Sequence, residues 1–164
     1  MDAGEALGAV AQVAVTLAGF AGIVVVFRPQ SVNEWSVLDR LRLRLLLGNS
    51  ALPLLAALFG IFLLTISPPL EAIWRCCSAF MLLLMVPFIA VNSSQARRLP
   101  AADRVGVNTI LYYSLAVLGT AGLVLQLINV LWWNQFWAFF AALFIFLAAG
   151  VVQFVRFVLL PPSG

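Results

Sequence analysis

The chain has 164 residues, of which 64% are hydrophobic and 9% are charged, and its formal net charge is +3. A soluble domain of this length cannot bury so much apolar surface, because a small domain has a large surface relative to its volume. The composition therefore excludes a soluble domain, a disordered chain and a protein that binds nucleic acid.

Five stretches of the chain are long and apolar enough to cross a bilayer as helices, which takes about 20 residues. Their apolar runs are continuous and do not alternate with period two, which favours helices over the strands of a barrel. The predicted spans are residues 6–27, 45–66, 72–91, 108–130 and 136–158. We therefore expect an all-α, polytopic membrane bundle in which residues 1–164 form a single transmembrane domain.

The first span, residues 6–27, is rich in small residues, which let helix backbones approach closely inside a membrane. Gln12 and Thr16 are four residues apart and share one helix face, and Gly19 is a neighbour of Thr16 on that side. This face is expected either to line a pore at a symmetry axis or to pack within the protomer's own bundle.

An arginine-rich segment, residues 34–44, precedes the second span. Its leucines recur at helical spacing, and Asp39 can pair with Arg42 three residues further on. The pattern predicts an amphipathic helix that runs into the second span. Its arginines either set the topology and contact anionic lipid head groups, or form a basic vestibule for anions or a docking site for a protein.

Within the second span, Asn49 lies one turn before Pro53, and a proline deprives the carbonyl four residues earlier of its helical hydrogen bond. Such irregular backbone binds ions where it lines a cavity. Asn49 is therefore a candidate for lining a pore together with Gln12, Thr16 and Gly19. The alternative role for these residues is helix packing and hydrogen bonding between helices.

Arg75 lies about one turn inside the third span, where a charge is costly. We expect it either to reach outward and pair with Glu71, four residues earlier, or to form an ion pair with Glu5 at the outer mouth. The adjacent Cys76 and Cys77 point about 100° apart on a helix. They are expected to pack as small apolar residues and not to bridge or to bind a metal.

Only five residues separate the fourth and fifth spans, and two of them are tryptophans. This spacing predicts a tight helical hairpin with a tryptophan-rich tip. Gln126 and Asn129, in the outer third of the fourth span, are expected to form hydrogen bonds between helices.

The arginines predict the orientation, because loops on the cytoplasmic side carry an excess of basic residues. With five spans, eight of the nine arginines share one side: Arg28, Arg40, Arg42, Arg44, Arg97, Arg98, Arg104 and Arg156. We therefore expect the N-terminus outside and the C-terminus inside. The basic face expected toward the cytoplasm consists of Arg40, Arg42, Arg44, Arg97 and Arg98.

An enzyme is not expected. The carboxylates lie at predicted interfaces, the chain contains neither histidine nor lysine, and it has no phosphate-binding loop, nucleophile motif or metal motif. No cofactor is expected either. A carboxylate near the middle of the membrane, which is typical of proton-coupled carriers, is also missing.

Two functions of different classes remain. The first is a homo-oligomeric ion channel or pore, because five short helices leave little room for a conduction path inside one protomer. The second is a non-catalytic accessory or assembly subunit of a larger membrane complex. The expected partners are the lipid bilayer, further copies of the chain, and inorganic ions or another membrane protein. The expected location is the plasma (inner) membrane of a bacterium.

Overall fold

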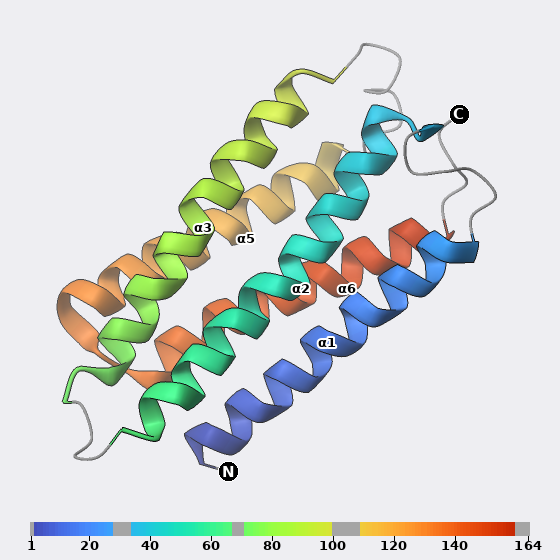
Figure 1. The fold of residues 1–164 in the computed structure, drawn as a ribbon. Helices are drawn as coiled ribbons and strands as arrows, with labels where there is room; N and C mark the ends of the chain where they lie inside the picture. The colour runs from blue at the N-terminus through green and yellow to red at the C-terminus, as the bar shows by residue number, and fades with distance from the viewer. Residues whose placement is uncertain (1, 28–33, 67–70, 100–108, 160–164) are drawn as a thin grey trace.

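The computed structural model describes residues 2–27, 34–66, 71–99 and 109–159. Within these residues the chain forms five long helices, and a short π-helix, η2, extends one of them (Figure 1). Each long helix, with η2 counted in the fourth, is long and apolar enough to cross a membrane, so the expected five-span helical architecture is confirmed. The elements are α1 (Ala3–Phe27), α2 (Val37–Leu64), α3 (Ile73–Arg97), α5 (Thr109–Ile128), η2 (Asn129–Trp133) and α6 (Phe136–Leu159).

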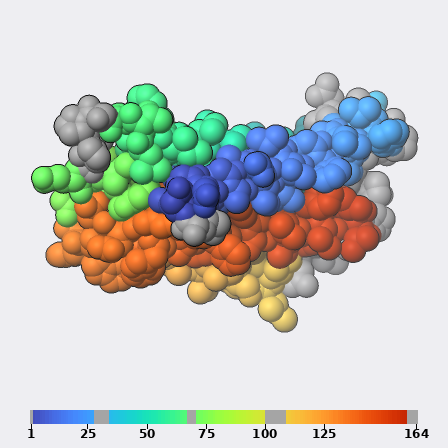
Figure 2. Space-filling model, turned by 90° about the horizontal axis from the view of Figure 1, so that it is seen from below, coloured from blue at the N-terminus to red at the C-terminus, as the bar shows by residue number. Residues whose placement is uncertain are grey.

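The helices α2 and α6 hold the bundle together. The helix α2 packs against α1, α3 and α6, while α6 also packs against α1 and α5. In the view of Figure 2, α6 lies between α1 and α5, and α1 is visible at the surface along its length. The first helix is therefore an edge element of the bundle, with one face on α2 and α6.

One end of the bundle gathers most of the arginines. There the rings of Trp35 and Phe157 lie 5.8 Å apart, and Leu99 packs against the first turns of α2. This end, here called the arginine end, carries Arg40, Arg42, Arg44, Arg97, Arg98 and Arg156. Arg28 and Arg104 lie outside the described residues. Arg75 lies at the opposite end, so the described arginines are sorted between the two ends as the sequence predicts, and the sidedness in a membrane stays a prediction.

The approach segment and the second span form one helix, as the amphipathic pattern predicts. The helix α2 begins at Val37, and the side chain of Ser36 caps it by accepting a hydrogen bond of 3.1 Å from the Asp39 N–H. The expected pair forms as well, with Arg42 Nη1 3.0 Å from Asp39 Oδ1. Both side chains are buried, so this ion pair is part of the interior.

The third helix runs on past the expected boundary. The predicted span ends at residue 91, before the polar run of residues 92–94, yet α3 continues to Arg97. The Asn92 amide donates a hydrogen bond of 2.7 Å to the Phe88 carbonyl, and the Ser94 hydroxyl donates one of 2.7 Å to the Val91 carbonyl. Because these polar side chains hydrogen-bond to carbonyls one turn earlier in the same helix, their donor groups are satisfied and the helix continues.

The predicted hairpin between α5 and α6 is confirmed, with a refinement at its tip. The last turn of the first arm is a π-helix, which the sequence pattern does not predict. Asn134 then adopts the left-handed conformation, with φ of 52°, and its N–H donates a hydrogen bond of 3.0 Å to the Asn129 carbonyl. Trp132 and Trp133 are exposed at the tip.

Candidate functional site

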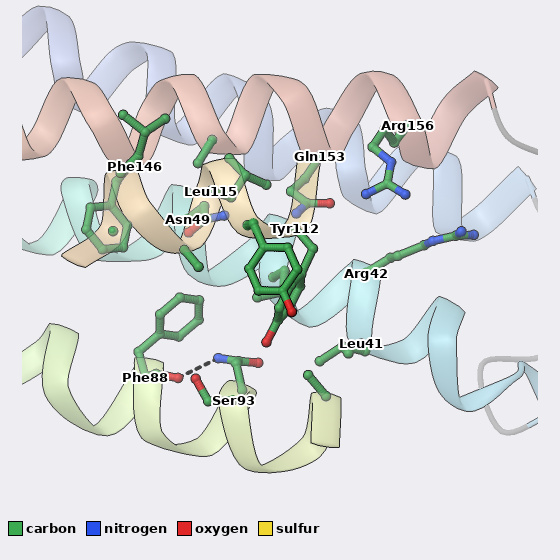
Figure 3. A pocket seen from close by; sticks show the side chains of 18 of the residues that line it. Leu41, Arg42, Asn49, Phe88, Ser93, Tyr112, Leu115, Phe146, Gln153 and Arg156 are labelled. Carbon is green, nitrogen blue, oxygen red and sulfur yellow. Dashed lines mark hydrogen bonds between the residues drawn. The ribbon is translucent and has the colours of Figure 1, made fainter. Parts of the chain in front are cut away.

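A cavity of about 430 Å³ lies between α2, α3, α5 and α6, in the half of the bundle nearer the arginine end (Figure 3). Its wall is largely apolar because each of the four helices contributes leucine, isoleucine, phenylalanine or tyrosine side chains to it. They include Leu38, Leu41, Leu45, Phe88, Tyr112, Leu115, Ile145 and Phe146. The volume falls in the range of about 300–1,000 Å³ that is usual for small-molecule sites.

Three buried amide side chains line this cavity, and each comes from a different helix. Asn49 of α2, Asn92 of α3 and Gln153 of α6 are 7%, 7% and 5% exposed. The Asn92 Nδ2 group bonds to the Phe88 carbonyl, which directs Oδ1 elsewhere. Among the described residues, Asn92 Oδ1 and Gln153 Oε1 are buried without a hydrogen-bond partner. A buried oxygen without a hydrogen bond destabilises the folded protein, so these two atoms indicate a binding position for a hydrogen-bond donor.

The arginine end of the cavity is positively charged. Arg42, Arg97 and Arg156 line it, and Asp39 neutralises Arg42. Arg156 forms no ion pair with any residue that the structure describes. Figure 3 shows the order along the cavity, with Phe146 and Asn49 at the deep end, then Gln153, then Arg156. Charge therefore gathers at one end and apolar side chains at the other.

The predicted pore-lining residues of α1 lie on its outer face. Glu5, Gln12, Thr16 and Gly19 are exposed and Gly8 is half-exposed, at spacings that keep all five on one helix face. A Cβ atom added to Gly8 or Gly19 would meet nothing within 4 Å. We call these five residues the α1 stripe. The stripe is not packed against the rest of the described chain.

The candidates from the first two spans therefore occupy two separate places. Asn49 of α2 is buried and faces α6. A Cβ atom added to Gly150 of α6 would lie 3.6 Å from the Cβ atom of Asn49. Gln12, Thr16 and Gly19 are exposed on the outer face of α1. The structure does not bring Asn49 together with the α1 stripe, and it joins Asn49 instead to Asn92 and Gln153.

Sequence reasoning had not grouped Asn92, Gln153 and Arg156 into one site. Each lies within about two turns of a helix end that faces the arginine-rich loops. Comparing the depth of each polar residue from the arginine end would have placed Asn92 and Gln153 at similar levels. That comparison is the signal by which the sequence could have revealed the cavity.

The charged residues at the opposite end take part in local hydrogen bonds, Asp2 and Glu5 through their carboxylates and Arg75 and Glu71 through their backbone. The Asp2 N–H donates to Glu5 Oε2 at 3.1 Å and the Glu5 N–H donates to Asp2 Oδ1 at 2.7 Å, which is a reciprocal cap of α1. The Arg75 N–H donates to Asn134 Oδ1 at 2.8 Å, and Asn134 Nδ2 donates to the Glu71 carbonyl at 2.8 Å. Within the described residues, Arg75 makes no ion pair with Glu5 or Glu71. A role of these three charges at an outer mouth stays a prediction.

A buried hydrogen-bond network joins the hairpin to α3. Asn129 Nδ2 donates to Ser78 Oγ at 2.7 Å and to the Gln135 carbonyl at 3.1 Å, while Asn129 Oδ1 accepts from the Gln135 N–H at 2.8 Å. Gln126 Nε2 donates to the Ala138 carbonyl at 2.8 Å. The predicted hydrogen bonding of Gln126 and Asn129 between helices is confirmed.

The remaining predicted residues divide between surface and interior. Arg40, Arg44, Arg97 and Arg98 are exposed at the arginine end, whereas Arg42 is buried. Four of the five arginines of the expected basic face are therefore exposed, and Arg97 and the buried Arg42 also line the cavity. Both cysteines are free thiols, and of the two only Cys77 is buried, so packing is the role of Cys77 alone.

Comparisons of the chain with protein-family models, with curated proteins and with solved structures found no match.

Proposed function

We propose that the protein is a non-catalytic, homo-oligomeric ion channel or pore of the plasma (inner) membrane of a bacterium, with the α1 stripe facing the symmetry axis. One observation carries this proposal. The Gln12 side chain is exposed on a helix that is long and apolar enough to cross a membrane, and no described residue hydrogen-bonds its amide. The nearby Thr16 hydroxyl is satisfied because it donates to the Gln12 backbone carbonyl at 2.8 Å.

An amide that faces hydrocarbon loses the hydrogen bonds it makes in water, and lipid tails offer none in return. A second copy of the chain, or water in a pore between copies, restores them. Hydrogen bonds between membrane helices contribute about 0.6–2 kcal/mol each. The stripe therefore gains free energy when several copies bring it together.

The small residues of the stripe support close approach around an axis. Gly8 and Gly19 leave open space beside α1, so the backbone of a neighbouring copy can come near. In a closed ring every copy contributes the same face. Glu5 then forms a ring of carboxylates at one mouth, and Gln12 and Thr16 form uncharged polar rings further in.

The same face becomes apolar toward the arginine end. Ile23 and Val26 continue the spacing of the stripe and are 51% and 79% exposed. Rings of such side chains close a narrow pore by excluding water from it. In the proposed channel they form the constriction.

The experiment tests position and conduction together. In a background with Cys76→Ser and Cys77→Ala, Gln12→Cys is expected to cross-link between copies in native membranes. The matched control is Leu83→Cys on α3, which is 70% exposed and far along the surface from the α1 stripe, and which is expected to stay uncross-linked. In liposomes, the purified Gln12→Cys protein is expected to pass potassium or chloride, and a bulky thiol reagent is expected to stop the flux.

Each other outcome contradicts the channel. A protein that purifies as a monomer without cross-linking at position 12 overturns the oligomer. A cross-linked ring without ion flux overturns conduction. A chain that is lost without a second, different membrane protein supports the accessory subunit, in which that partner covers the stripe.

A further inference from the structure

The cavity holds two unsatisfied acceptor atoms that the proposed channel does not use. Asn92 and Gln153 are more than nine-tenths buried, both line the cavity, and Asn92 Oδ1 and Gln153 Oε1 lack partners among the described residues. Carbonyl-type oxygens accept hydrogen bonds, so the group that meets them carries an O–H or an N–H.

A cation lies about one turn nearer the end of the same helix. Arg156 follows Gln153 by three residues on α6, and these two side chains point into the cavity from neighbouring turns (Figure 3). The Asp39 carboxylate is occupied by Arg42 at 3.0 Å, so the cavity's net charge at this end is positive. Guanidinium groups bind carboxylate and phosphate through paired hydrogen bonds.

Beyond its amide side chains the wall of the cavity is apolar, and the cavity shares lining residues with a second groove. The deep part is walled by Phe88, Leu115 and Phe146. A second groove runs over the surface between α3 and α5 and shares Ser93 and Arg97 with the cavity. Both helices are long and apolar enough to cross a membrane, so in the proposed membrane protein this groove borders the lipid. A ligand with an apolar chain therefore has an entry path from the bilayer.

We propose that each protomer binds a single-chain anionic amphiphile with a hydroxyl group beside its anionic group. Its carboxylate or phosphate contacts Arg156, its hydroxyl donates to Gln153 or Asn92, and its hydrocarbon chain lies along Phe88, Leu115 and Phe146. The volume of about 430 Å³ suits one chain and not the two chains of an ordinary phospholipid. Two sources have this chemistry, a lysophosphatidate from the bilayer and a β-hydroxy fatty acid.

The test measures saturable binding to the full chain in nanodiscs of phosphatidylcholine. The probes are a lysophosphatidate, a β-hydroxy fatty acid, the same fatty acid without the hydroxyl, and an uncharged monoacylglycerol. Both hydroxylated anions are expected to bind at least about tenfold more tightly than the monoacylglycerol, because the free energy of a charge-assisted hydrogen bond to Arg156 corresponds to about that ratio of affinities. The tighter of the two identifies the source.

Variants assign each part of the ligand to a residue. Arg156→Gln is expected to lower the affinity for the anions about tenfold, whereas Arg44→Gln, an exposed arginine at the same end that does not line the cavity, leaves it unchanged. Gln153→Leu is expected to remove the preference for the hydroxylated over the plain fatty acid. Its effect on the plain fatty acid is expected to be small, because that ligand has no hydroxyl to lose.

A substitution that fills the cavity with a side chain tests the binding position independently of charge and hydrogen bonding. Ala149 lines the cavity and Ala148 beside it is exposed and does not. Ala149→Phe is expected to abolish ligand binding, whereas Ala148→Phe is expected to retain it. Thermal unfolding in detergent is measured for both variants, to show that a loss of binding is not a loss of folding. Equal binding of charged and uncharged probes, or equal loss in Arg156→Gln and Arg44→Gln, overturns the proposal. Because the assay measures a ligand and not ion flux, its outcome is independent of the proposed channel.

Discussion

At the scale of the residue, Gly48 sets the shape of the cavity wall. A Cβ atom on Gly48 of α2 would overlap the ring of Phe88 on α3, and that ring forms part of the wall. Membrane helices approach closely where one of them offers only a hydrogen atom. The position of the Phe88 ring, and with it the width of the cavity, therefore depends on this glycine.

Gly48→Ala is expected to destabilise the protein by about 1–3 kcal/mol, because Phe88 must leave its place in a packed interface. The displaced ring narrows the cavity, so the affinity for the proposed amphiphile is expected to fall as well. The control is Gly119→Ala, at a glycine of α5 that lines the same cavity with nothing within 4 Å of its added Cβ. Thermal unfolding in detergent measures the difference. A Gly48→Ala protein as stable as Gly119→Ala shows that the interface accommodates the methyl group.

At the scale of the element, the lengths of the apolar stretches and the spacing of the polar residues predicted most of the helices and their connections. The continuous α2, its Asp39–Arg42 pair and the tight hairpin all follow from spacing along one helix, which a sequence displays directly. The π-helical turn and the extension of α3 do not follow. They depend on side chains that bond to carbonyls in the folded chain, and residues 92–94 have the same composition whether they end a helix or continue one.

The hairpin of α5 and α6 is held by Asn129. Its side chain is fully buried and reaches Ser78 of α3 and both backbone groups of Gln135. Asn129→Leu keeps the branched shape and the number of side-chain heavy atoms but leaves the partners of Asn129 without hydrogen bonds, so we expect a loss of about 2 kcal/mol in unfolding free energy. Thr120→Val is the control, because the Thr120 hydroxyl is exposed and bonds only within its own helix. Unfolding in mixed detergent micelles compares the two. Equal stability of the two variants contradicts a structural role for the network.

At the scale of the whole molecule, the sequence predicted which residues were candidates but not how they combine. Gln12 and Asn49 were grouped because both are polar in apolar spans, yet one faces outward from α1 and the other lies in the cavity. The rotation of each helix about its axis decides this, and that rotation is set by contacts such as Gly60 against Leu7. Such contacts join residues far apart in the chain, so no local pattern encodes them.

The sorting of charge between the two ends makes a prediction about the molecule as a whole. Six described arginines lie at the arginine end, and the opposite end carries Arg75 with the carboxylates Asp2, Glu5 and Glu71. Arginines are retained on the cytoplasmic side during insertion, so we expect the arginine end inside and the hairpin tip outside. The exposed tryptophans of the tip suit an interface on either side and do not decide the direction.

Thiol labelling of intact spheroplasts tests this orientation. In the background with Cys76→Ser and Cys77→Ala, a membrane-impermeant reagent is expected to label Gln135→Cys at the hairpin tip at once. Arg98→Cys at the arginine end is expected to react only after the membrane is permeabilised. Both residues are exposed, so burial in the protein does not protect either thiol. The reverse pattern places the arginine end outside. In that case the cavity opens toward the outer leaflet, and the anionic amphiphile that enters between α3 and α5 comes from that leaflet.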